Sequence, residues 1–118
     1  MSPLEQFDSV LQNGTLQAEE SSNGLEVDEH IRKLDGVLRE AYSQALSLSR
    51  ENNDLETSLG IWYKMELFCE KVRRLGRGFM NGDRHLEAGS VAEKAEEMGF
   101  ACRARWKNIK TELDHLDK

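Results

Sequence analysis

One apolar seam in the last third of the chain constrains the fold more than any other feature. Nine small or apolar residues follow one another at alternating spacings of four and three, at positions Ala88, Ala92, Ala95, Gly99, Cys102, Trp106, Ile109, Leu113 and Leu116. This spacing keeps them on one side of an α-helix and is typical of a helix that packs along other helices. Small side chains line the first half, so we expect a neighbouring helix to approach closely there.

The rest of the chain also favours helices. Its single proline is residue 3, so no proline interrupts a helix further along the sequence. Residues 26–50 repeat the four-three spacing, and residues 54–80 carry two adjacent apolar stripes, which predicts a helix at the centre of a bundle or at an interface. The predicted fold class is therefore all-α: an antiparallel three-helix bundle with coiled-coil-like packing over residues 26–50, 54–80 and 84–117, plus a short N-terminal helix.

The first 25 residues are predicted to form a separate region, followed by the bundle over residues 26–118. Ser2 can cap a helix that has Pro3 in its first turn, and Gly14 is a typical place for that helix to end. Residues 15–25 are polar and acidic, which indicates a flexible linker. Asn53 is the expected cap of the helix that begins near residue 54.

Charge is distributed unevenly along the chain. The net charge is −6, but residues 1–60 hold 4 Lys/Arg against 12 Asp/Glu, whereas residues 61–118 hold 12 against 10. An acidic total argues against a dedicated nucleic-acid binder. The N-terminus lacks a signal-peptide pattern, and no apolar run is long enough to span a membrane. Cys69 and Cys102 are expected to be free thiols in the core, as is typical of a reducing compartment. We therefore expect an intracellular, cytoplasmic protein, with a nuclear location left open.

The basic run near the C-terminus supports an alternative function. Its cations are Arg103, Arg105, Lys107 and Lys110. Ala95 and Gly99 are spaced like the alanine and the turn glycine of a helix-turn-helix, which predicts a DNA-recognition helix in the basic segment after Gly99. The string CRARWKNIK also resembles the end of the last helix in Myb-like and MADF-type DNA-binding domains. A turn at Gly99 would reset the apolar periodicity, because the two helices of a helix-turn-helix cross at a large angle. The seam instead continues through Gly99, which favours one continuous helix.

Two groups of residues are candidates for binding a partner protein. The N-terminal segment offers an apolar face suited to a partner's groove. Tyr63 falls outside the apolar stripes of its helix, and an aromatic side chain in such a position is a candidate interface anchor. The positive charge of a basic cluster near residue 74 either complements the partial negative charge of the helix C-terminus or binds an acidic segment, such as this chain's own N-terminal region. The candidates are Leu4, Phe7, Leu11, Tyr63, Arg73, Arg74 and Arg77.

No residue pattern predicts catalysis. The sequence contains no phosphate-binding loop, dinucleotide fingerprint or nucleophile elbow. The pair Glu112 and His115 has the spacing of helical metal ligands but lacks the second such motif that these sites require. We therefore expect no enzyme activity, cofactor or metal. The expected function is a helical adaptor or regulatory subunit that binds another protein or a second copy of itself.

Overall fold

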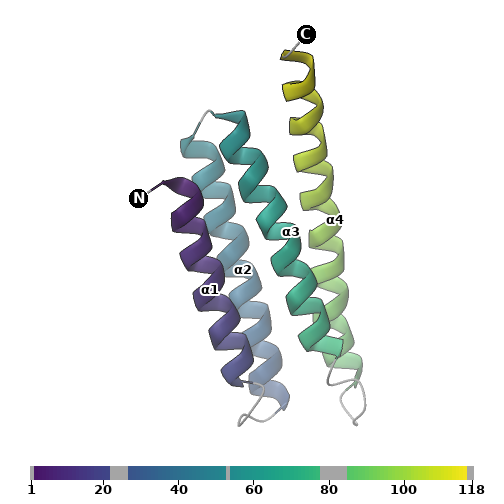
Figure 1. Ribbon diagram of the computed structural model, residues 1–118. Helices are drawn as coiled ribbons and strands as arrows, with labels where there is room; N and C mark the ends of the chain where they lie inside the picture. The colour runs from purple at the N-terminus through teal and green to yellow at the C-terminus, as the bar shows by residue number, and fades with distance from the viewer. Residues whose placement is uncertain (1, 22–26, 53, 78–84, 117–118) are drawn as a thin grey trace.

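The structure, a computed structural model, describes residues 2–21, 27–52, 54–77 and 85–116. These ranges form four helices: α1 (Pro3–Ser21), α2 (Val27–Glu51), α3 (Leu55–Arg77) and α4 (His85–Leu116). Successive helices run in opposite directions along an elongated bundle of 55 × 26 × 16 Å (Figure 1). The predicted all-α antiparallel bundle is confirmed. Residues 78–80 and 84, which were predicted to belong to the third and last long helices, and residues 22–25 of the predicted linker lie outside the described residues.

Helix α3 is the centre of the bundle, as its apolar sequence predicts. It packs against α1 and α2 and, most extensively, against α4. Ile61 and Met65 are fully buried, and Trp62 and Phe68 are nearly so. Within the described residues α1 and α4 make no contact with each other, because they lie on opposite flanks of α3. Helix α2 packs on one side of α3 between those two flanks, so only the side of α3 that faces away from α2 is left uncovered.

Helix α1 is longer and more firmly packed than the sequence suggests. It continues through Gly14 to Ser21, so the predictions that Gly14 ends the helix and that residues 15–21 belong to a linker are wrong. A Cβ at Gly14 would lie 3.1 Å from Cζ of Phe68, a buried ring of α3. The glycine therefore lets α1 approach α3. Phe7 and Ala18, one on each side of Gly14, are buried in the core.

Two helix starts are capped by side chains. The backbone N–H of Glu5 donates to Oγ of Ser2 at 3.2 Å, as predicted for α1. At the start of α3, Oδ1 of Asp54 accepts the N–H of Glu56 at 3.2 Å and Oδ2 accepts the Thr57 hydroxyl at 2.6 Å. The bond from Thr57 holds the pKa of Asp54 below its ordinary value. The expected cap, Asn53, lies outside the described residues.

Helix α4 is one uninterrupted helix, as the seam predicts. It runs through Gly99 without a turn, and no described glycine has a positive φ. Ala95 and Cys102 are fully buried, and a Cβ at Gly99 would lie 3.4 Å from Cβ of Cys69 on α3. The close helix approach expected along the small residues is therefore present at Gly99. The side chain of Ala88 lies outside the described residues.

The C-terminal end of α4 extends past the other helices (Figure 1). At 32 residues α4 is longer than α2 with 25 and α3 with 23, which confirms the predicted difference in length. Trp106 and Ile109 pack against the core, but Leu116 is 72% exposed. The seam therefore loses its packing partner before it ends.

Candidate functional site

An exposed apolar patch surrounds Leu67 on the uncovered side of α3. Leu67 is 50% exposed and lines a groove on each side of its helix. Leu16 of α1, 56% exposed, lines the first groove, and Phe100 of α4, 57% exposed, lines the second. Neighbouring exposed apolar side chains on three helices mark a surface suited to a partner. We call Leu16, Leu67 and Phe100 the Leu67 face.

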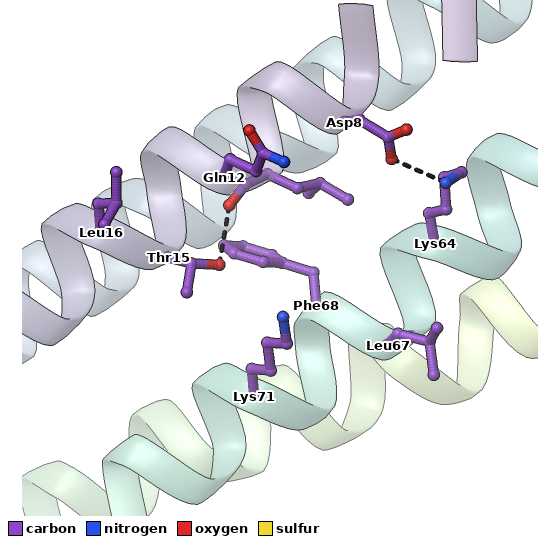
Figure 2. Close-up of a pocket in the computed structure, with 9 residues that line it drawn as sticks. Asp8, Gln12, Thr15, Leu16, Lys64, Leu67, Phe68 and Lys71 are labelled. Carbon is purple, nitrogen blue, oxygen red and sulfur yellow. Dashed lines mark hydrogen bonds and ion pairs between the residues drawn. The ribbon is translucent and has the colours of Figure 1, made fainter. Parts of the chain in front are cut away.

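The first groove lies between α1 and α3 and has a volume of about 480 Å³. Figure 2 shows its lining, to which Leu11, Leu16 and Phe68 contribute apolar surface. Nζ of Lys64 on α3 lies 2.7 Å from Oδ1 of Asp8 on α1, so an ion pair joins the two helices beside the groove. The groove is thus mainly apolar, with one neutralised charge pair.

Lys71 adds an unneutralised cation to this groove. Its side chain rises from α3 toward α1 (Figure 2). It is exposed, and no carboxylate of the described residues forms an ion pair with it. An anionic group entering the groove would meet a free ammonium.

The second groove, between α3 and α4, has a volume of about 430 Å³ and is lined by Arg73 and Arg74 of the predicted basic cluster. The Glu70 carboxylate accepts hydrogen bonds from Nε and Nη2 of Arg73 and from Nε of Arg74, the two Nε bonds at 2.8 and 3.2 Å. The bonds from Arg73 lower the pKa of Glu70, and the same contact raises the pKa of Arg73. Nη2 of Arg77 lies 3.4 Å from Oε2 of Glu96. The described partners of the three arginines are thus carboxylates of α3 and α4.

The three predicted anchors of the N-terminal segment pack on the chain's own bundle. Phe7 is fully buried, and Leu4 and Leu11 are partly buried against the core. Leu4 lies so close to α3 that a Cβ at Gly60 would be 2.8 Å from its Cδ2. These side chains already occupy a site within the chain, so they do not form a free docking motif in this structure.

Tyr63 lies beside a polar junction that joins α3 to α4. It is 46% exposed and meets the Trp106 ring edge to face, with centroids 5.5 Å apart. Nε1 of Trp106 donates to Oε1 of Glu66 at 2.7 Å, and Nε of Arg103 donates to Oε2 at 2.8 Å. Nη2 of Arg103 lies 2.7 Å from the same Oε2 in an ion pair. One glutamate therefore receives two hydrogen bonds and one ion pair from α4, while Tyr63 keeps part of its ring accessible.

Two of the four cations predicted to bind nucleic acid contact the bundle itself. Arg103 is held by Glu66 as just described. The Arg105 guanidinium stacks 4.4 Å from the Trp62 ring centroid, and its Nη2 donates to the Tyr42 hydroxyl at 3.2 Å. Both arginines therefore help to attach α4 to α2 and α3.

The other two cations lie further along α4 toward its C-terminal end. Lys107 and Lys110 are exposed, and Nζ of Lys107 lies 6.0 Å from the centroid of the neighbouring Trp106 ring. The run is continuous with the rest of α4, so the described residues contain no separate recognition helix after Gly99. Nucleic-acid binding by these four residues stays a prediction.

The two cysteines face each other in the α3–α4 interface. Cys69 and Cys102 are both buried and free of disulfides, as expected for core thiols. The hydrogen bond with Cys102, together with burial, raises the pKa of Cys69. Both thiols therefore belong to the packed interface rather than to an exposed reactive site.

Sequence reasoning missed the three residues of the Leu67 face. Leu67 and Phe100 lie outside the four-three seams of their helices. Tyr63 also lies outside these seams, and this position is what identified it as a candidate partner contact. Leu16 was assigned to a linker, because Gly14 was interpreted as the end of its helix. The off-seam criterion, applied to every large apolar residue, finds Leu67 and Phe100; Leu16 requires the correct length of α1.

Comparison with protein-family models, with curated proteins and with solved structures finds no match. Among the residues that the structure describes, no three His, Cys, Asp or Glu side chains are grouped as a metal site would require. None of the four helices, over its described length, is apolar enough to cross a membrane. What the candidate site can bind therefore follows from the apolar and charged side chains of its own surface.

Proposed function

We propose that this protein is a non-catalytic protein-interaction module that serves as a small adaptor or regulatory subunit. It binds another protein or a second copy of itself through the Leu67 face. The observation that carries this proposal is the half-exposed Leu67 side chain between two grooves, with Leu16 and Phe100 exposed on either side. A partner that covers this face removes apolar surface from water, which is the main driving force of most protein association.

The central position of α3 explains why this face remains open. The sequence predicted more apolar surface on α3 than packing on two sides consumes, and α1 covers part of that excess. What stays exposed is the strip between α1 and α4, where Tyr63 and Leu67 lie one helical turn apart. The proposal thus retains Tyr63 as a partner contact and adds Leu67.

Charged groups around the face are suited to orienting a partner. The Arg74 and Arg77 side chains are 75% and 53% exposed although each contacts a carboxylate. Exposed charges at the rim of an interface influence the association rate and the choice of partner more than the affinity. We assign these two arginines to the rim of the binding surface, and Arg73, which is more buried beside Glu70, to its support.

Site-specific photo-cross-linking in the native cell tests this function. A benzophenone amino acid replaces Leu67 in one variant and Ser43, an exposed residue of α2 that lines none of the grooves, in the control. Covalent adducts to a second copy or to another protein are expected at position 67 and not at position 43. The proposal is wrong if position 67 yields no adduct or yields the same adducts as position 43.

A further inference from the structure

The groove between α1 and α3 is long enough to hold a short helix. An adjacent cavity of about 230 Å³ shares Thr15, Phe68 and Lys71 with the α1–α3 groove and extends this groove as far as Leu75. From Lys64 to Leu75 the α3 wall spans eleven residue steps, or about 16 Å at the α-helical rise. This length matches about three turns of a third helix lying along the groove.

The shape of the groove suits an amphipathic helix. Its two walls are helices that run in the same direction, and a helix packs between two others by inserting its side-chain ridges into their grooves. Leu11, Leu16, Leu67 and Phe68 provide apolar surface on both walls. Such a surface accepts apolar side chains spaced i, i+4 and i+7 on one face of the incoming helix.

Charge decides which amphipathic helix fits. Lys64 is neutralised by Asp8, but Lys71 has no carboxylate partner among the described residues. A helix that covered the groove would remove water from the Lys71 ammonium, and an unpaired cation is costly to desolvate. A carboxylate on the incoming helix supplies the missing counter-charge and forms a charge-assisted hydrogen bond.

We propose that the α1–α3 groove binds a three-turn amphipathic helix of a partner protein, with a glutamate or aspartate of that helix placed against Lys71. This inference rests on the proposed function and identifies the kind of partner that the α1 side of the Leu67 face accepts. The partner's apolar side chains fill the space between Leu16 and Leu67. Its acidic residue sets the position and direction of the helix in the groove.

A displayed peptide library tests the proposal without knowledge of the partner. Peptides of about four helical turns carry apolar residues at i, i+4 and i+7, with the flanking positions randomised among Glu, Lys and Gln. The full chain is the target, and Lys71→Glu is the charge-reversed target. Lys33→Glu, at an exposed lysine of α2 that lines none of the grooves, is the matched control.

The chain and the Lys33→Glu control are expected to select the same acidic flanking position, and Lys71→Glu is expected to select lysine there. For a selected acidic peptide, Lys71→Glu should weaken binding about fivefold, as expected for an exposed charge pair. Leu67→Asp and Leu16→Asp, one on each wall, should each weaken it about tenfold or more. Circular dichroism confirms that both aspartate variants remain folded.

Four results overturn the inference. Three of them come from the library: no helical peptides are selected, the acidic preference persists with Lys71→Glu, or the selected peptides bind the parent chain and both aspartate variants with equal affinity. Cross-links at position 67 that join only copies of this chain also contradict a helix from another protein. In each case adducts at position 67 would still support the proposed function, so the two failures are distinguishable.

Discussion

Replacing Glu66 by alanine should weaken the attachment of α4 to α3 more than any other surface substitution on that interface. The Glu66 side chain is 16% exposed, accepts hydrogen bonds from the Trp106 indole and from Nε of Arg103, and forms an ion pair with the Arg103 guanidinium. Alanine leaves the partly buried indole N–H without an acceptor and frees Arg103. The loss therefore combines an unsatisfied donor with a broken ion pair.

The magnitude follows from the exposure of each partner. An unsatisfied buried donor costs about 1–3 kcal/mol. The Arg103 side chain is 50% exposed, so solvent reduces its ion pair to about 0.5–1 kcal/mol. Together these terms predict a loss of about 1.5–4 kcal/mol in the free energy of unfolding, which lowers the melting temperature of a domain this size by roughly 5–20 °C.

Urea unfolding followed by tryptophan fluorescence and far-ultraviolet circular dichroism measures this loss. Glu66→Gln keeps an acceptor for the indole, so it and Arg103→Ala should each cost only about 1 kcal/mol. Glu93→Ala, at an exposed glutamate of α4, is the matched control and should change stability by less than about 0.5 kcal/mol. The reasoning is refuted if Glu66→Ala lowers the free energy of unfolding no more than Glu93→Ala does, or by the same amount as Glu66→Gln.

Three further predictions concern other parts of the bundle. Phe7→Ala should destabilise the chain by about 3–5 kcal/mol in urea unfolding, because the ring is fully buried; an undocked N-terminal helix would show no loss. Gly99→Ala should leave stability unchanged or raise it by up to about 1 kcal/mol, whereas Gly99→Leu should cost about 1–3 kcal/mol by overpacking against Cys69; equal effects would mean that α3 and α4 are not close there. Arg73 lowers the pKa of Glu70, so the stability that this carboxylate contributes is fully present above its ordinary pKa of 4.5 and is lost as the pH falls through the lowered value. Glu70→Gln should therefore reduce the acid-induced fall in melting temperature, and an unchanged pH profile would contradict this.

Much of the fold follows from local patterns in the sequence. The four-three spacing defines three long helices whose observed bounds lie close to the predicted ones, because the periodicity of an α-helix is a property of the segment itself. Ser2 is recognisable as a cap for the same local reason. The surplus of apolar residues on α3 also predicts its central position, since a helix that is apolar on several sides must be covered on several sides.

Glycine shows where local patterns are insufficient. Gly14 and Gly99 both lie inside helices, although the sequence suggested a helix end at one and a continuous helix at the other. Around Gly99 the unbroken seam supplies the missing information. Around Gly14 no such seam exists, and its role depends on Phe68, which follows it by more than fifty residues. Only packing distinguishes a helix end from a close approach.

The candidate site depends on tertiary structure to a greater extent. The sequence determined by itself that the chain forms antiparallel helices, where the apolar seams of the three long helices lie, and that the last helix is longer than the two before it. Tertiary structure alone decided that α1 covers one flank of α3 and α4 the other, which leaves Leu67 exposed and Lys71 without a carboxylate among the described residues. The reason is physical: helix periodicity depends on neighbours three and four residues away, whereas exposure depends on which distant segments pack alongside.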